Sequence, residues 1–499
     1  MLRFGLCLLG AAIGASGFSA PPAPAKVSRI AFGSCADQNK PCPIWKKVAE
    51  SKADLLVLLG DNIYADLEAS DGRFKLKPST PETMASCYAE LAKVEAFKTI
   101  KESIYTLATW DDHDYGNNDA GVEWENKVDA QRQFLDFFCV PVDSPRRTRE
   151  GVYHSETFGP EGQRVQVIVL DGRYHRSTLR KADKPLSGTT IRPYLANTDP
   201  DATMLGEAQW KWLEEQLKLP ADVRIIGSGI QLVSDDHPFE KWSTMPNERD
   251  RLYKLIRESG ANGVIVLSGD RHLGDISVEP KAAGYPLYDI TSSGFNQGSA
   301  YYRDPEKNSK RVGGMPWGNN FGVVQIDWTA KDPLVSLQLR DEDGEVAAQA
   351  KVPLSKLQQK VDAKPTGGKP VDGEKEKDKP KVKLPEGVIT PEQALKGKKG
   401  DDVTVQMEVV SGNAVSGGKR ILLNSIKDFR SDDCFTIVIN EKAMTGDLDK
   451  ATFDTFKGKT VRVKGKLSEF KMKLQIQVDD PKAVEFVEEK KDDKKKEDK

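Results

Sequence analysis

Between residue 26 and about residue 352, short apolar segments alternate with segments of helical periodicity. The apolar segments contain many β-branched residues, which is typical of strands buried on both faces. Strands are expected at 27–32, 55–59, 104–109, 165–170, 223–226 and 264–267, and helices at 43–51, 80–103, 127–139, 206–217 and 247–259. Three later strands, at 287–291, 323–328 and 335–340, follow without intervening helices. This order predicts a layered α/β domain whose second half contains more antiparallel strands.

Four of the expected strands are followed directly by side chains that can bind a metal ion. These are Cys35 after the first strand, Asp61 and Tyr64 after the second, Asp111, Asp112, His113 and Asp114 after the third, and Asp270 and His272 after the last. Each motif alone is as typical of a turn or a surface hydrogen bond. Together they predict a metal site, because sites in α/β sheets form at the carboxyl ends of strands and buried strands hold side chains rigidly.

The motifs G-S-C, G-D-N-I-Y-A-D, W-D-D-H-D-Y-G-N-N-D and S-G-D-R-H, in this order, resemble the PhoD-type alkaline phosphatase/phosphodiesterase family of the metallophosphoesterase superfamily. The resemblance covers about residues 26–350. It implies a four-layer sandwich, two mixed sheets flanked by helices, with metals at one edge. It also implies hydrolysis of phosphoric monoesters or diesters. The alternative is a catalytically silent, secreted binding protein that uses the same scaffold to hold an anionic polymer.

Two-metal hydrolases hold their cations about 3.5–4 Å apart and need a carboxylate that reaches both. Asp61 is the best candidate for this bridge, because it leaves a buried strand at the centre of the fold. Thiolate and phenolate ligands favour a ferric ion over magnesium. The resemblance implies Fe(III) held by Cys35, Asp61, Tyr64 and His272, and a harder ion, Ca²⁺, held by Asp61, Asp112 and Asp270. A binuclear or a trinuclear site, and other divalent metals, are compatible with these motifs.

His113 directly follows a proposed ligand. The resemblance implies that its imidazole protonates the leaving alkoxide or assists the phosphate, while a metal-bridging hydroxide attacks phosphorus. Asn117, Asn118 and Gln231 are further candidate oxygen ligands, although hydrogen bonding in a loop is an equal explanation for Gln231. Arg173 and Arg271 are candidate phosphate contacts, and a structural ion pair is at least as good an explanation of each.

Residues 1–25 are typical of a secretory signal peptide. Arg3 supplies the positive start, residues 6–18 are apolar or small, and Ala23-Pro24-Ala25 offers a cleavage site. We therefore expect an exported protein, periplasmic or extracellular. No later run of about 20 apolar residues predicts a membrane-spanning helix. The charge balance, 74 Lys+Arg against 76 Asp+Glu, excludes a chain-wide basic surface for nucleic acid.

The catalytic domain is expected to span 26–354, and residues 355–385 are a Pro-, Gly- and charge-rich flexible linker. Five alternating strands within 386–487, with a helix before the fourth, resemble an OB-fold, a small closed β-barrel. Such a barrel predicts binding of an oligonucleotide or another anionic polymer, with Phe429 and Phe435 as a stacking platform or simply as core residues. Residues 488–499 form a charged, disordered tail.

Overall fold

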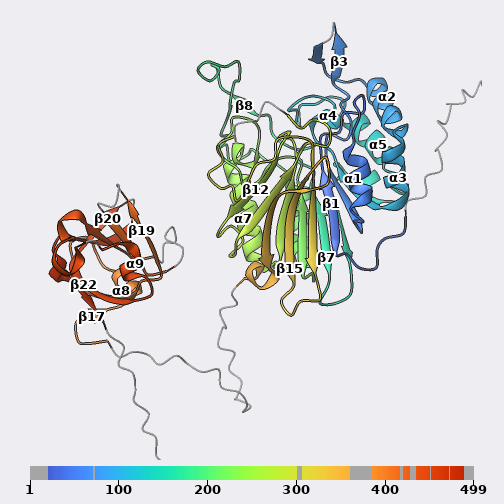
Figure 1. Cartoon of the computed structure of the whole chain (residues 1–499). Helices are drawn as coiled ribbons and strands as arrows, with labels where there is room; N and C mark the ends of the chain where they lie inside the picture. Colours follow the sequence, from blue (N-terminus) through green and yellow to red (C-terminus); the bar gives the residue numbers. More distant parts are fainter. Residues whose placement is uncertain are drawn as a thin grey trace, which may run out of the picture. The chain divides into compact units, whose positions relative to one another are not determined.

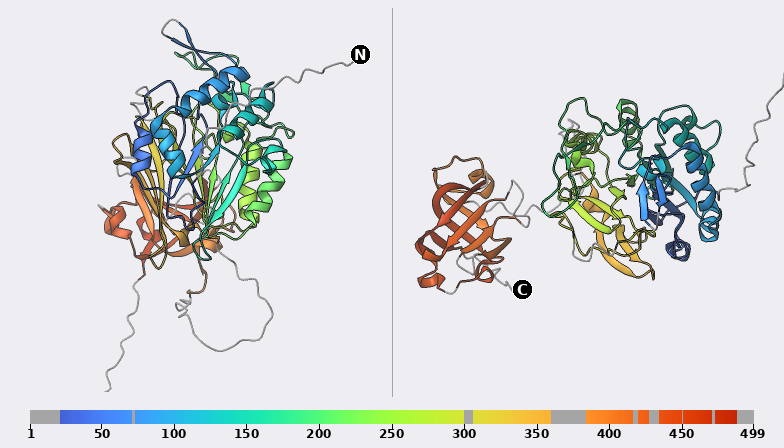
Figure 2. Two further views of the ribbon diagram at one scale, coloured as in Figure 1. Left: turned by 90° about the vertical axis from the view of Figure 1, so that its right-hand side faces the viewer. Right: turned by 90° about the horizontal axis from the view of Figure 1, so that it is seen from above.

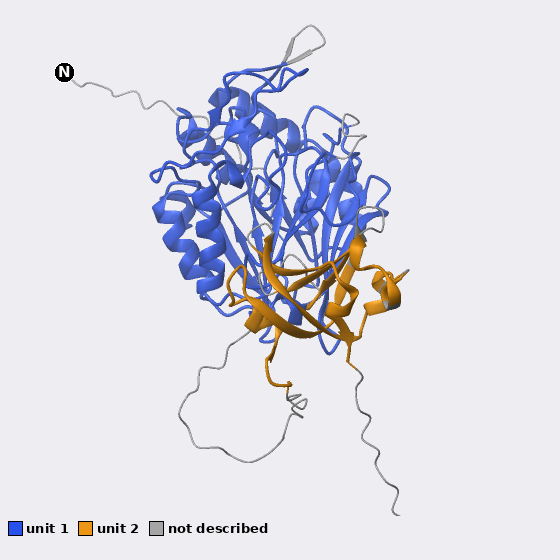
Figure 3. Cartoon of the chain, turned by 90° about the vertical axis from the view of Figure 1, so that its left-hand side faces the viewer, with its two compact units in different colours: residues 1–365 blue, residues 366–499 orange. Residues whose placement is uncertain are grey.

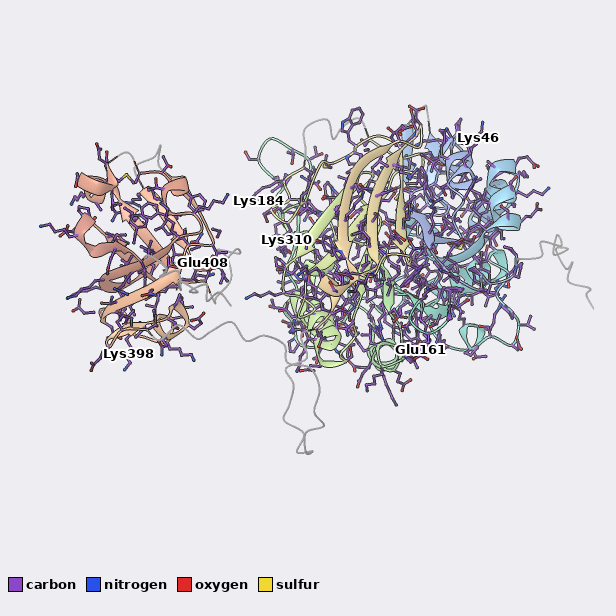
Figure 4. All side chains as sticks on the ribbon, turned by 60° about the horizontal axis from the view of Figure 1, so that its bottom comes forward. Lys46, Glu161, Lys184, Lys310, Lys398 and Glu408 are labelled. Carbon is purple, nitrogen blue, oxygen red and sulfur yellow. The ribbon has the colours of Figure 1, made fainter. Side chains whose placement is uncertain are left out.

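The computed structural model describes residues 21–70, 73–299, 306–359, 384–415, 420–426, 434–449, 451–470 and 473–487. The chain forms two compact units, Met1–Pro365 and Thr366–Lys499 (Figure 3). Charged side chains such as Glu161, Lys184 and Lys398 are exposed on their surfaces (Figure 4). Most of the predicted signal peptide and linker, and all of the predicted tail, lie outside the described residues and stay predictions.

The first sheet of unit 1 has the order β16-β15-β14-β1-β2-β5. Its strands are β1 (Arg29–Gly33), β2 (Leu55–Leu59), β5 (Tyr105–Thr109), β14 (Asn320–Asp327), β15 (Leu334–Asp341) and β16 (Val346–Pro353). β1, β2 and β5 are parallel, so the chain leaves all three at the same edge. β14, β15 and β16 continue the sheet as an antiparallel meander. β14 and β15 correspond to two of the three strands expected without intervening helices, while the third, at 287–291, lies in the second sheet, and no strand was predicted at β16.

The second sheet of unit 1 has the order β12-β13-β11-β10-β7-β6. Its strands are β6 (His154–Phe158), β7 (Val165–Val169), β10 (Val223–Gly227), β11 (Val264–Ser268), β12 (Gly274–Glu279) and β13 (Leu287–Ser292). The four central strands are parallel, and β6 and β12 are antiparallel edges. The Thr109 hydroxyl donates to the carbonyl of Leu170 over 2.7 Å, which joins the carboxyl ends of β5 and β7 across the two sheets.

Helices cover the outer face of each sheet (Figure 1, Figure 2). Those packed on the first sheet are α1 (Ile44–Glu50), α2 (Pro81–Ala92), α3 (Glu95–Ser103) and α5 (Lys127–Phe137); those on the second are α6 (Glu207–Leu217) and α7 (Pro246–Glu258). Alternate residues of β2 show the layering, because Leu56 and Leu58 pack with the first set of helices while Val57 packs with the second sheet. The expected mixed α/β architecture is confirmed. The single helix predicted over 80–103 is wrong, since the chain turns at Lys93 and forms two helices.

Short elements complete unit 1. These are the hairpins β3 (Leu67–Ser70) with β4 (Arg73–Leu76) and β8 (Arg180–Lys181) with β9 (Tyr194–Leu195), the helix α4 (Asp112–Tyr115), and the 3-10 turns η1 (Pro145–Arg147), η2 (Trp242–Thr244) and η4 (Leu354–Leu357). The α4 helix follows β5 directly and carries three acidic or basic side chains of the predicted site. Among the described residues, no helix has the length and apolar character needed to cross a membrane.

Unit 2 contains a mixed sheet in the order β17-β18-β22-β23-β21-β20-β19, with β24 paired to β22. Its elements are β17 (Val388–Ile389), α8 (Pro391–Ala394), β18 (Asp402–Glu408), β19 (Ser411–Val415), β20 (Arg420–Asn424), β21 (Thr436–Asn440), α9 (Phe453–Phe456), β22 (Thr460–Phe470), β23 (Lys473–Val478) and β24 (Val484–Phe486). The five expected strands and the helix before the fourth are present. Within the described residues no pairing closes this sheet into a barrel, so the OB-fold stays a prediction.

Candidate metal centre

The first cluster of donor atoms lies where β1, β2 and β11 end. The Cys35 Sγ atom is 3.3 Å from Asp61 Oδ2. The Tyr64 hydroxyl is 3.4 Å from the same oxygen and 3.2 Å from His272 Nε2. The four side chains expected to share iron therefore surround one point, and the ligand atoms of Cys35, Asp61 and His272 all lie within 4.8 Å of one another.

A second cluster of donor atoms adjoins the first. The ligand atoms of Asp61, Asp112 and His113 lie within 4.8 Å of one another, and so do those of Asp111, Asp112 and Asp270. Asp61 belongs to both clusters, which is the placement that a bridging carboxylate needs. The structure thus brings together all the predicted metal ligands from four strand ends of two different sheets.

The backbone is left-handed at four of these positions, with φ of 64° at Cys35, 50° at Asp61, 70° at Asp270 and 55° at His272. Such conformations cost about 1–3 kcal/mol each outside glycine and concentrate at functional sites. Each one turns the chain sharply just after a strand, so that the side chain stays at the sheet edge. Gly60 allows the turn at Asp61 to approach the chain after β5 closely, because a Cβ at Gly60 would lie 2.4 Å from the Asp111 backbone nitrogen.

The electrostatics of the clusters favour bound cations. Burial raises the pKa of Asp61 well above its usual range against the opposing charge of His113, and the carboxylate of Asp112 raises it further. Burial and the nearby Glu240 likewise raise the pKa of Asp270. Burial lowers the pKa of His272 to about 3, which leaves the neutral imidazole that binds metals. Buried carboxyls, a thiol, a phenol and a neutral imidazole therefore fit a cation site, because opposite charge is what would let these acids ionise.

His113 lies on α4 and is held by Asp66. The Nδ1 atom of His113 is 2.6 Å from Asp66 Oδ1, and the His113 amide donates to Asp61 Oδ1 over 3.3 Å. Although burial opposes it, the carboxylates of Asp112 and Asp61 raise the pKa of His113 well above its ordinary value. Sequence reasoning missed Asp66, even though this residue ends the G-D-N-I-Y-A-D motif.

The two candidate phosphate-binding arginines both have carboxylate partners. Arg173 is buried, donates through Nε to Asp111 Oδ1 over 2.6 Å, and pairs with Glu240 through two hydrogen bonds of 3.1 and 2.5 Å. Arg271 donates to Glu306 over 2.6 Å and stacks on the ring of Phe239. Their geometry is that of structural ion pairs, the alternative that the sequence left open for each.

Two acidic residues without a predicted role adjoin Asp112. The ligand atoms of Asp112, Asp119 and Glu240 lie within 4.8 Å of one another. The Asp119 amide donates to Asp112 Oδ2 over 2.8 Å, and the Tyr194 hydroxyl donates to Asp119 Oδ2 over 2.5 Å. Asp119 ends the W-D-D-H-D-Y-G-N-N-D motif, which is the signal that could have found it. Glu240 lies in a loop that no quoted motif and no strand or helix pattern marks.

The candidate oxygen ligands Asn117 and Gln231 differ in their hydrogen bonds. The backbone N–H of Asn117 donates to the backbone carbonyl of Asp112 over 3.1 Å, so this residue lies beside the second cluster. Gln231 donates through Nε2 to Thr291 Oγ1 over 2.8 Å, as the loop hydrogen-bonding alternative predicts. The Oε1 atom of Gln231 is buried and has no hydrogen-bond partner in the described part of the chain, which leaves one buried acceptor available.

Unit 2 gives no support to the predicted capture of an anionic polymer. Phe435 is completely buried in the core of the sheet, and Phe429 lies outside the described residues. The Arg462 guanidinium on β22 is already engaged by Gln406 and Glu485. In the described portion of this unit, the predicted aromatic platform is therefore not present at Phe435, since a core side chain cannot stack on a base.

The two mixed sheets, the helices outside them and the buried donor clusters at their edge define a metallophosphatase-like protein. The model of the family described as "PhoD-like phosphatase" matches residues 30–327. The chain belongs to this family, whose members are phosphoesterases, and the resemblance drawn from the motifs is confirmed. The OB-fold likeness of unit 2 has no such support.

Two relatives are similar to this chain. Alkaline phosphatase D of Bacillus subtilis (strain 168) is 25% identical over 289 residues, which cover 51% of this chain and 47% of the relative. The chain thus spans about half the length of the curated relative that it matches. A solved structure described as "Structure of PhoD" superposes with a TM-score of 0.50 at 18% identity and covers 67% of this chain and 73% of its own. That second likeness shows the fold alone.

The clusters predict that bound cations stabilise unit 1. Removal with EDTA should lower its thermal midpoint, since a cation at 100 times its Kd contributes about 2.7 kcal/mol. Tryptophan fluorescence is the readout, because all eight tryptophans precede residue 329. Asp270→Asn should be no less stable than wild type in EDTA, as it relieves repulsion and asparagine tolerates left-handed backbone, but should lose most of the gain on adding Ca²⁺.

Asp250→Asn is the matched control, because Asp250 is an exposed aspartate on α7. This variant should keep the full response to EDTA and Ca²⁺. A wild-type protein whose midpoint is the same with EDTA, with Ca²⁺ and as purified would contradict the cation site.

Proposed function

We propose that this chain is a metal-dependent hydrolase of phosphoric esters, acting on monoesters or diesters. The observation that carries the proposal is the pair of donor clusters sharing Asp61, found in a chain of the PhoD-like phosphatase family. The binding-only alternative is the weaker one, because every main motif position holds a side chain competent to bind metal.

In this proposal Fe(III) is held by Cys35, Asp61, Tyr64 and His272, and Ca²⁺ by Asp61, Asp112 and Asp270. Cations in such a site supply Lewis acidity and neutralise charge on the phosphoryl group. The distances of 3.2 to 3.4 Å among Cys35, Asp61, Tyr64 and His272 support the first set. Asn117 and the free Oε1 of Gln231 are secondary oxygen candidates.

His113 is proposed to give a proton to the leaving oxygen of the ester. Its Nδ1 atom is engaged by Asp66, so Nε2 is the ring nitrogen that can face a substrate. Against the effect of burial, Asp66, which is not a proposed metal ligand, contributes to the raised pKa of His113 and so favours the protonated ring, which suits a proton donor. Asp66 is a positioning residue that fixes the ring and stabilises its charge, as carboxylates do for catalytic histidines elsewhere.

The thiolate ligand can be tested by elemental analysis. The protein as purified should contain about one iron per chain, and Cys35→Ala should lose it together with at least about 100-fold in kcat/KM. Cys139→Ser is the control, since Cys139 is an exposed free thiol. Zinc or manganese in place of iron, with Cys35→Ala fully active, would remove the thiolate–iron assignment. Folded protein with neither metal nor hydrolysis would favour the binding-only alternative.

The role of His113 can be tested with two leaving groups. His113→Ala should lower kcat by about 10²–10⁴-fold, with a greater loss on an alkyl phosphate than on p-nitrophenyl phosphate, whose leaving group needs no proton. Asp66→Asn should cost about tenfold, and the double variant should resemble His113→Ala because the two act as a unit. His175→Ala, which removes a part-exposed histidine paired with Glu150, should leave kcat unchanged. Equal losses on both esters would argue against proton donation.

We also propose that the protein is exported, because residues 1–25 have the order of charge, apolar core and cleavage site of a signal peptide. Amino-terminal sequencing of the protein recovered from periplasm or medium should begin near residue 26. A cytoplasmic protein that retains Met1 would contradict export.

A further inference from the structure

A cavity of about 490 Å³ lies at the side of unit 1, between the edge strands of the two sheets. β5 and β6 line it, and the Tyr105 hydroxyl spans it by donating to Glu156 over 2.8 Å. The segment from Phe138 to Arg149 and the α6 residue Trp212 form the other walls. None of the candidate metal ligands lines this cavity, so it is separate from the metal centre. Its volume is within the range of small-molecule sites.

The polar lining of the cavity is predominantly cationic. Arg146, Arg149 and Lys101 line it, against a single acid, Glu156, which already accepts the Tyr105 hydroxyl. Lys101 is engaged by the carbonyl of Phe137. Arg149 donates to the carbonyl of Tyr153 and stacks on its ring. The Nε atoms of Arg146 and Arg149 are buried and have no hydrogen-bond partner within the described residues.

Arg147, the neighbour of Arg146 in η1, has protein partners for its guanidinium and therefore serves as a comparison for Arg146. Its guanidinium pairs with Asp136 over 2.5 Å and donates to the carbonyls of Leu135 and Val140. The Arg146 side chain makes no hydrogen bond or salt bridge to any residue that the structure describes, although it is partly buried and lines this half-open cavity. Burial, then the adjacent Arg149 and Arg147, lower the pKa of Arg146 to about 9.

A guanidinium that lines a cavity without a protein partner is stabilised by an anion whose oxygens accept hydrogen bonds from its N–H groups. The cavity lining also includes apolar side chains, among them Phe138, Val140 and Trp212. We propose that the cavity binds a small organic anion, with a carboxylate or similar oxyanion on Arg146 and Arg149 and an apolar body against Phe138 and Trp212. This ligand is distinct from the phosphoric ester proposed for the metal centre, and the inference does not depend on that proposal.

Calorimetric titration of the full chain with 4-phenylbutyrate and 4-phenylbutyramide tests this inference. The two probes share an apolar body and differ only in charge. The acid should bind at one site at least about tenfold more tightly than the amide, since charge-assisted hydrogen bonds contribute more than neutral ones. Arg146→Gln should bring the two affinities together. Arg132→Gln, on an exposed arginine paired with Asp129, should leave the difference intact.

Four results would overturn the inference. Equal affinities of acid and amide for the wild type, or an acid affinity unchanged in Arg146→Gln, would remove the role of the guanidinium. Loss of acid binding after EDTA treatment would place the anion at the metal centre instead. If neither probe bound at up to about 10 mM, the binding free energy available from the cavity would be less than about 3 kcal/mol, which would contradict the inference. The wild-type contrast needs no variant, so misfolding of Arg146→Gln does not spoil the test.

Discussion

The acids held at the carboxyl ends of β2, β5 and β11 are the constraint on which this structure depends. Asp61, Asp112 and Asp270 lie in neighbouring clusters in the interior, where charged groups are costly unless paired. Only rigid sheets with strained turns can hold like charges this close. The left-handed residues and the interior acids are therefore two aspects of one arrangement, which a cation completes.

Arg173 supplies positive charge on one side of the acid clusters. Arg173 is buried against Asp111 and Glu240, and it is 3.9 Å from Asp112. The opposed charges of His113 and Arg173 outweigh burial and lower the pKa of Asp112. Asp61 and Asp270 depend more on ions from solution, because their nearest cationic neighbours do not overcome burial. The chain thus compensates part of the charge itself and leaves the rest to bound metal.

The α/β fold class and most of the donor residues could be predicted from the sequence, because both follow from local patterns. Apolar runs mark the strands, and the residues directly after them must lie at a sheet edge. The break at Lys93 inside the predicted 80–103 helix could not be predicted, since no proline or glycine marks it. Whether the sheet of unit 2 closes into a barrel could not be predicted from the sequence either, because closure depends on pairing between strands far apart in the chain.

The sequence by itself determined which side chains leave each strand, and therefore that thiol, phenol, carboxyl and imidazole groups converge on one edge of the sheets. Only the tertiary structure decided which of them meet. It placed Asp66 against His113, and Glu240 against Arg173, through loops that carry no periodic pattern. It also left Arg146 facing a cavity while Arg147 pairs with Asp136. The physical reason is that partners distant in sequence are chosen by packing of whole layers, which no local pattern encodes.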